Sequence, residues 1–135
     1  MPPKLTIFTD GGARGNPGPA AIGIVIKDGH GKILQQTAEY IGHATNNQAE
    51  YKALLKGLEL AKKYQPQEII VYLDSELVVK QMKQEYRVKD NDLQSLFIKV
   101  WNLALGFKKV SYHHISRSLN KEADLLLNQE LDKNC

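Results

Sequence analysis

The sequence predicts an α/β fold: a five-stranded mixed sheet flanked by helices, in a single domain over residues 1–135. A length of 135 residues with 42% hydrophobic and 24% charged residues is typical of one globular domain. Three β-prone segments joined by short connections open the chain, and helix-like and strand-like segments alternate after them. Hairpin-linked strands followed by βαβ crossovers produce a mixed sheet with helices on its faces. The expected order is β-β-β-α-β-α-α-β-α.

Short β-prone runs bounded by turn signals predict the first three strands, at residues 4–9, 20–27 and 32–41. The first run ends at Asp10, and the glycine-rich stretch Gly11–Pro19 is expected to form a loop. An Asp-Gly-His-Gly turn separates the second strand from the third. Such tight connections favour an antiparallel meander.

A helix is expected after the third strand. Thr45 is its predicted N-cap, because Gln48 three residues later completes a capping box. The predicted buried stripe consists of Leu54, Gly57, Leu58 and Ala61. The helix should end before Pro66, and the apolar run 68–73 then predicts a strand buried on both faces.

The remaining third of the chain alternates helix and strand signals. Helices are expected at residues 75–85 and 90–105, with a fifth strand at 108–115. The last helix should begin after Ser118 or Asn120 and extend to about residue 132.

Four acids stand out by their positions in these elements. Asp10 and Asp74 each follow an apolar strand, at the sheet edge where open α/β folds collect ligands. Glu50 and Asp124 share apolar helix stripes. Taken singly, each acid has a structural alternative, as a turn or helix cap, a helix-dipole partner or a solvated charge. Taken together, the four predict one carboxylate cluster.

A carboxylate cluster in a folded core indicates bound cations, because desolvated like charges repel strongly. Oxygen ligands without a His or Cys set suit Mg²⁺ or Mn²⁺ better than zinc. Two divalent ions per site are the established arrangement for phosphodiester cleavage. The sequence therefore suggests metal-dependent phosphodiester chemistry.

Other polar features have weaker signals. The glycine-rich loop matches neither a phosphate-binding P-loop nor a dinucleotide motif, and it is either a site for close approach of a polymer or an ordinary hairpin. His113 and His114 end the fifth strand and either move protons near the acids or are plain surface residues. Arg117 either holds a phosphate or pairs with a surface acid.

Composition excludes several classes of protein. Cys135 is the single cysteine, so an internal disulfide is excluded, and the longest apolar run is far too short to span a bilayer. The N-terminal residues show no signal-peptide core, and a cytoplasmic location is expected. The net charge of +3 permits nucleic-acid binding without requiring it.

Four sequence blocks, in order over nearly the whole chain, resemble those of type I ribonuclease H. They are Thr9-Asp10-Gly11-Gly12 with Gly15-Asn16-Pro17-Gly18, Thr45-Asn46-Asn47-Gln48-Ala49-Glu50, Leu73-Asp74-Ser75, and Asn120-Lys121-Glu122-Ala123-Asp124. The resemblance implies a ribonuclease H fold and endonucleolytic cleavage of the RNA strand of RNA/DNA hybrids, which leaves 3′-hydroxyl and 5′-phosphate ends.

The resemblance also implies roles for individual residues. The metal-binding catalytic acids would be Asp10, Glu50, Asp74 and Asp124, holding two Mg²⁺ ions, with Mn²⁺ as an alternative. Glu50 would also accept a hydrogen bond from a ribose 2′-hydroxyl. The hybrid's minor groove would be lined by Gly11, Gly12, Asn16, Asn46 and Asn47, and Thr45 would hold a DNA-strand phosphate. His114 matches a mobile histidine that assists product release, and Arg117 matches an arginine found in compact members.

The chain departs from the best-known bacterial form between Asp74 and the fifth strand, where the extra helix of a basic handle has no counterpart. The sequence thus resembles compact archaeal-like and bacterial members, and another grip, through residues such as Lys80, Lys83, Arg87 and Lys89, is expected. A non-catalytic or double-stranded-RNA-directed protein of the same fold is the alternative. The expected state is a monomer with no obligate protein partner and no membrane association.

Overall fold

The computed structural model describes residues 2–135 and contains one five-stranded sheet with the strand order β3-β2-β1-β4-β5. The strands are β1 (Lys4–Ala13), β2 (Gly18–Asp28), β3 (Ile33–Ala44), β4 (Glu68–Leu73) and β5 (Val110–His114). Strand β2 pairs antiparallel with both β1 and β3, whereas β1, β4 and β5 run parallel. The predicted mixed sheet and its opening meander are confirmed.

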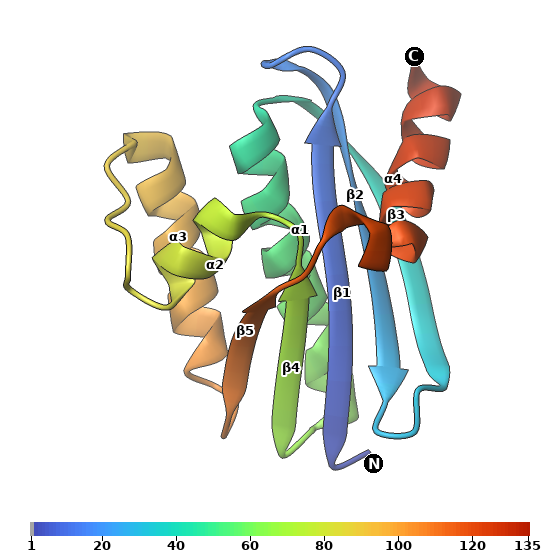
Figure 1. The fold of residues 1–135 in the computed structure, drawn as a ribbon, viewed down its shortest axis with the longest axis vertical. Helices are drawn as coiled ribbons and strands as arrows, with labels where there is room; N and C mark the ends of the chain where they lie inside the picture. Colours follow the sequence, from blue (N-terminus) through green and yellow to red (C-terminus); the bar gives the residue numbers. More distant parts are fainter. Residues whose placement is uncertain (1) are drawn as a thin grey trace.

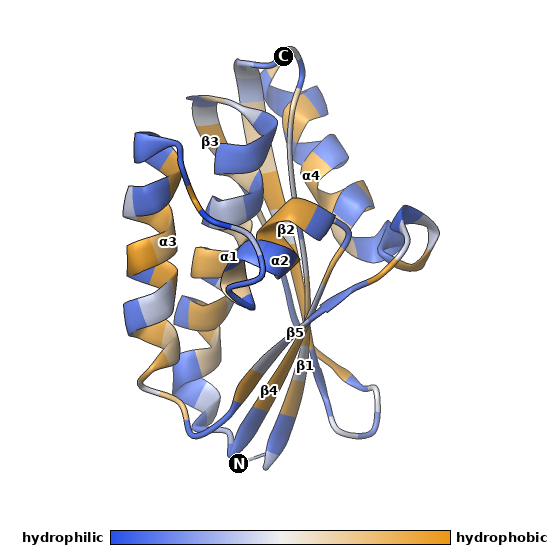
Figure 2. Ribbon diagram, turned by 60° about the vertical axis from the view of Figure 1, so that its left-hand side comes forward, coloured by the Kyte–Doolittle hydropathy of each residue, from blue (hydrophilic) through white to orange (hydrophobic). Residues whose placement is uncertain are grey.

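Two helical layers cover the sheet (Figure 1). The helices are α1 (Asn46–Ala61), α2 (Glu76–Met82), α3 (Asn91–Ala104) and α4 (Lys121–Asn134), with short 3₁₀ turns at Lys62–Tyr64 and Arg117–Leu119. Figure 2 shows α1 and α3 on one face of the sheet and α4 on the other. None of the helices in the described part of the chain is both long and apolar enough to cross a membrane.

The main core lies between the sheet and α1. Leu54, Leu58 and Ala61 of the predicted stripe are fully buried and share one cluster with Leu5 and Ile7 of β1. Beside Thr9, α1 comes so near the sheet that a Cβ added at Gly57 would lie 3.1 Å from the Thr9 Cγ2 atom. The stripe therefore holds α1 against β1 close to Thr9, the residue that precedes Asp10.

Strand β4 corrects one expectation. The apolar run predicted burial on both faces, but only Ile69, Val71 and Leu73 are fully buried, while Ile70 and Tyr72 are half-buried. The reason is that α4 packs against β1, β2 and β3 and leaves the front of β4 uncovered (Figure 1).

The end of β1 and the connection between α2 and α3 both bear on the site. Strand β1 extends past its expected end, because residues 10–13 pair with residues 20–23 of β2. Residues 83–90 join α2 to α3 without a further helix, so the expected absence of a handle agrees with this structure.

Candidate active site

Three carboxylates meet where the parallel part of the sheet ends. The last parallel pair of β1 and β4 is Thr9 with Leu73, so Asp10 and Asp74 follow it side by side. Glu50 reaches them from the first turns of α1. One carboxylate oxygen from each of these three acids lies within 4.8 Å of the other two. The register of two strands and the stripe of one helix thus build the predicted cluster.

Glu50 is held by the way α1 begins. The Thr45 side chain accepts a hydrogen bond from the Gln48 N–H at 3.1 Å, and the Gln48 side chain accepts one from the Thr45 N–H at 2.9 Å. The predicted capping box is confirmed. One residue past the first turn, the Glu50 Oε1 atom accepts a hydrogen bond from the Gly11 N–H at 2.6 Å. Strand β1 therefore orients the carboxylate that α1 supplies.

Asp124 enters from the opposite layer. Helix α4 packs so closely on β2 that a Cβ added at Gly23 would lie within van der Waals overlap of the Ala123 carbonyl oxygen. Asp124 lines the same cavity as the three clustered acids, and its Oδ1 atom lies 3.7 Å from the Arg117 Nη2 atom. It stands outside the tight group of three, half-buried and paired with a cation.

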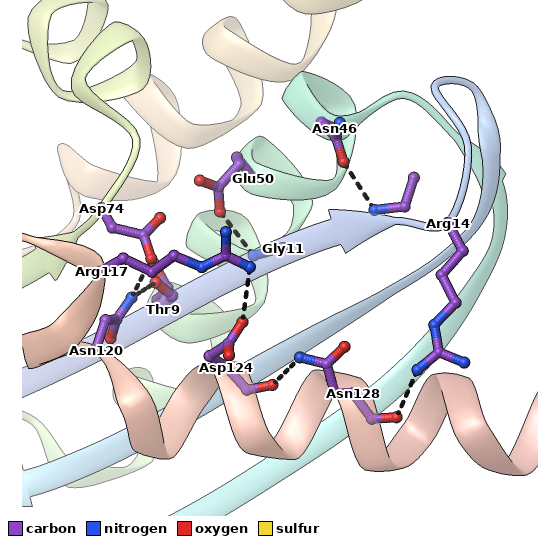
Figure 3. A network of polar contacts seen from close by, with 11 residues as sticks. Thr9, Gly11, Arg14, Asn46, Glu50, Asp74, Arg117, Asn120, Asp124 and Asn128 are labelled. Atoms are coloured by element: carbon purple, nitrogen blue, oxygen red, sulfur yellow. Dashed lines mark hydrogen bonds and ion pairs between the residues drawn. The ribbon is translucent and has the colours of Figure 1, made fainter.

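Asn120 is a site residue that the sequence pattern did not identify as one. It occupies the N-cap position of α4 as expected, but its side chain makes no capping hydrogen bond. Its Nδ2 atom instead donates to the Thr9 carbonyl oxygen at 2.9 Å and to the Asp74 Oδ2 atom at 3.4 Å (Figure 3). This buried amide ties the start of α4 to β1 and to a carboxylate of the cluster.

The cluster is electrostatically unfavourable without a cation. Burial raises the pKa of Asp10 to about 8, and the neighbouring Asp74 and Asp124 carboxylates add to the effect. Burial, followed by the charges of Asp10 and Asp74, also raises the pKa of Glu50, against the opposing effect of the Gly11 hydrogen bond. Protons or a metal ion must offset this repulsion. An all-oxygen donor set in which the two buried carboxyls, Asp10 and Glu50, have raised pKa values fits a hard divalent cation such as Mg²⁺ or Mn²⁺.

The acids form the floor of an open cavity of about 420 Å³. The other lining residues include Gly11, Gly12, Asn46 and Asn47, all predicted to contact substrate. The remaining two such residues, Asn16 and Thr45, line an adjoining cavity of about 240 Å³ together with Asn47.

Hydrogen bonds tie the glycine-rich loop to the start of α1. The Asn46 Oδ1 atom accepts from the Ala13 N–H at 2.9 Å, and the Asn46 N–H donates to the Asn16 Oδ1 atom at 3.0 Å. The two groups of predicted substrate contacts are therefore one continuous surface.

Arg117 and the two histidines, the residues predicted to assist the acids, are placed differently. Arg117 lines the cavity and faces Asp124 (Figure 3). His113 and His114 are exposed on β5, outside the residues that line this cavity. The His113 ring instead contacts Tyr72 and the Ser111 hydroxyl.

Comparison with known proteins gives consistent matches. The family described as reverse transcriptase-like matches residues 8–130. The bifunctional protein Rv2228c of Mycobacterium tuberculosis is 42% identical over 130 residues, which cover 96% of this chain and 36% of that protein. RNase H1 from the archaeon Halobacterium salinarum is 41% identical with a TM-score of 0.94, over 96% of this chain and 98% of that one. LC11-RNase H1, solved in complex with an RNA/DNA hybrid, is 43% identical with a TM-score of 0.92, again over 96% and 98%.

This chain spans about a third of the length of the mycobacterial relatives that it matches. The solved ribonuclease H1 chains, in contrast, are covered almost completely. The family match extends from β1 into α4 and so includes every element that supplies an acid to the cavity. The chain belongs to the type I ribonuclease H family.

Proposed function

We propose that this chain is an endonuclease that hydrolyses the RNA strand of RNA/DNA hybrids with two divalent metal ions, Mg²⁺ or alternatively Mn²⁺. The products would carry 3′-hydroxyl and 5′-phosphate ends. The observation that carries the proposal is the group of three carboxylates, two buried and one half-buried, in an open cavity, which a cation would neutralise. Bound divalent ions supply an activated water and stabilise the charge on the phosphate oxygens.

The chain's own side chains hold and orient the reacting groups. Asp10, Glu50 and Asp74 would bind the ions, and Asp124 would complete the ligand set from α4. The Gly11 N–H fixes one Glu50 oxygen and leaves the other free to bind an ion or a ribose 2′-hydroxyl. Such a contact would let the site distinguish RNA from DNA.

Recognition of the hybrid would fall to the surface beside the acids. Gly11, Gly12, Asn46 and Asn47 would contact the minor groove, together with Asn16, and Thr45 would hold a phosphate of the DNA strand. Of the two candidates for assisting the site, the cavity favours Arg117, because His114 lies outside its lining. A monomer suffices, because all four acids come from one chain.

Cleavage assays in which both the nucleic-acid substrate and the metal ion are varied test the proposal. End-labelled RNA/DNA hybrid, RNA duplex and DNA duplex are incubated with the protein in Mg²⁺, Mn²⁺ or EDTA. The expected result is metal-dependent cutting of the RNA strand of the hybrid, with no cutting in EDTA. Hybrid binding without cleavage in either metal would reject the enzyme in favour of a binding protein, and preferential cutting of RNA duplex would reassign the substrate.

Replacing Glu50 by Gln should remove most of the activity and leave the fold intact. The amide oxygen of Gln can still accept the Gly11 hydrogen bond, but the charge that would bind a cation is gone. We expect kcat to fall by about 10³-fold, the upper range for loss of one electrostatic group in an active site. Glu59→Gln, an exposed substitution on the same helix, is the matched control. If the melting temperature of Glu50→Gln collapses, Glu50 has a mainly structural role.

A further inference from the structure

Arg14 lies in the cavity of the acids but has no part in the function proposed above. It belongs to the loop between β1 and β2, and it lines the cavity together with Arg117 and the four carboxylates. These two arginines are the only cationic side chains among the lining residues. Arg117 faces Asp124, whereas the guanidinium of Arg14 lies farther along α4 (Figure 3).

The contacts of Arg14 leave most of its donors available. Its Nη2 atom donates to the Asp132 Oδ1 atom at 2.6 Å and to the Asn128 carbonyl oxygen at 3.4 Å. Within residues 2–135 the side-chain hydrogen bonds of Arg14 use Nη2 alone, so Nε and Nη1 keep their hydrogens for a ligand. A guanidinium with open donors is suited to bidentate binding of a phosphate.

The loop presents this side chain from a fixed backbone. The Arg14 N–H donates to the Pro19 carbonyl oxygen at 2.8 Å, and the neighbouring Ala13 N–H is bound by the Asn46 side chain. The direction of the arginine is therefore set by the hairpin and by α4 before any ligand arrives.

The spacing suits a phosphate of the bound strand that lies a few positions away from the scissile one. Asn128 and Asp132 follow Asp124 by one and two helical turns, which corresponds to about 6 and 12 Å along α4. A single strand of a duplex carries one phosphate per ~3.4 Å of helix axis. A strand that has its scissile phosphate at the acids and follows α4 would bring further phosphates to the level of Arg14.

Asp132 is a weak competitor for the arginine. The side chains of Arg14 and Asp132 are 42% and 68% exposed, and ion pairs this open to water contribute little to stability. A phosphodiester can therefore replace the carboxylate at low cost.

We propose that Arg14 binds a phosphodiester of the cleaved strand a few positions away from the scissile one, and that Asp132 holds the guanidinium in place until the strand binds. The proposal rests on the proposed hydrolysis of hybrids. It assigns to the cavity a second anchoring point, on the side away from Arg117. An arginine that only ties the loop to α4 would be the alternative.

Steady-state cleavage of hybrid over a series of salt concentrations tests the assignment. Arg14→Gln should raise KM about tenfold, keep kcat within about twofold, and reduce the slope of log KM against log salt by about 0.9, the value for one lost phosphate contact. Arg14→Lys keeps the charge and should retain the wild-type slope. Lys133→Gln removes one exposed positive charge on α4 outside the cavity and is the control, with KM and slope unchanged.

Asp132→Asn separates the two roles. If Arg14 binds phosphate, removal of its competitor should lower KM or leave it at the wild-type value. If Arg14 only ties the loop to α4, Asp132→Asn should raise KM as Arg14→Gln does, and the proposal is overturned. A salt slope for Arg14→Gln equal to that of Lys133→Gln also overturns it. A wild-type protein that cuts no hybrid in any metal rejects the proposed function itself. The two outcomes that overturn the role of Arg14, in contrast, leave the proposed function standing.

Discussion

Asp10→Asn should abolish hybrid cleavage and make the metal-free protein more stable. The side chain lies in the cluster beside Glu50 and Asp74, so its substitution would remove a cation ligand, and we expect cleavage to fall by at least about 10³-fold. The same carboxylate is buried beside Asp74 and Asp124, which is unfavourable for its charged form. A neutral amide of the same shape relieves that cost. Cleavage rates and thermal unfolding in EDTA measure the two effects.

The stability gain should depend on pH in a defined direction. The pKa of Asp10 is raised from its ordinary value of 3.8 to about 8 in the folded chain. Between these two pH values the folded state therefore holds a proton on Asp10 that the unfolded state has lost. Stability of the metal-free wild type therefore falls as pH rises through this window. Asp10→Asn should match the wild type near pH 4 and exceed it by ~2 kcal/mol, or roughly 5 °C, at pH 8.

Asp28→Asn is the matched control, because the same substitution at this position should lower the stability instead of raising it. Asp28 accepts hydrogen bonds from the His30 and Lys32 N–H groups, and these bonds lower its pKa. Its charge supports the folded state at neutral pH, so its removal should lower the melting temperature. Equal changes of the melting temperature in both variants, or an Asp10→Asn variant less stable than the wild type, would contradict the electrostatic account of the cluster.

Gly11→Ala should both destabilise and inactivate the protein. A Cβ at this position would overlap the Ala49 carbonyl group and approach the Glu50 nitrogen to 2.6 Å. Because these are backbone atoms, either α1 or β1 must move. We expect a loss of ~3 kcal/mol in unfolding free energy, at the upper end for overpacking, and loss of the Gly11 to Glu50 hydrogen bond. Chemical denaturation and hybrid cleavage measure the two losses.

The adjacent Gly12 provides a control for stability. A Cβ there would meet only the Leu127 Cδ1 atom, at 3.4 Å, and that methyl group can adjust. Neither glycine has a positive φ, so backbone strain does not distinguish them. If Gly12→Ala destabilises the chain as much as Gly11→Ala, close packing of α1 on β1 is not the cause.

Much of the site could be predicted because its parts lie at element ends with clear signals. The capping box at Thr45 fixed where α1 begins, and helical spacing then put Glu50 on the buried stripe. The apolar runs that predict β1 and β4 end at Asp10 and Asp74, and this placed both acids at the sheet edge where strands end. Each of these inferences uses a signal within a single element or at its end.

Contacts between distant elements could not be predicted in this way. Asn120 looked like an N-cap, and only the approach of α4 to β1 reveals that its amide reaches Thr9 and Asp74. The half-open face of β4 depends on how far α4 extends across the sheet, which the apolar run 68–73 does not encode. Arg14 acquires its partner Asp132 across 118 positions of sequence.

Helix α4 gives the site a particular sensitivity. It supplies Asp124, yet Leu127 and Leu131 join Ala21 in a small apolar cluster separate from the main core under α1. Detachment of α4 would therefore leave most of the protein folded while the site loses one wall and one acid. Cleavage therefore requires that the sheet and the helices on both of its faces are in place. On heating, we expect hybrid cleavage to be lost at a lower temperature than the one at which the main core unfolds.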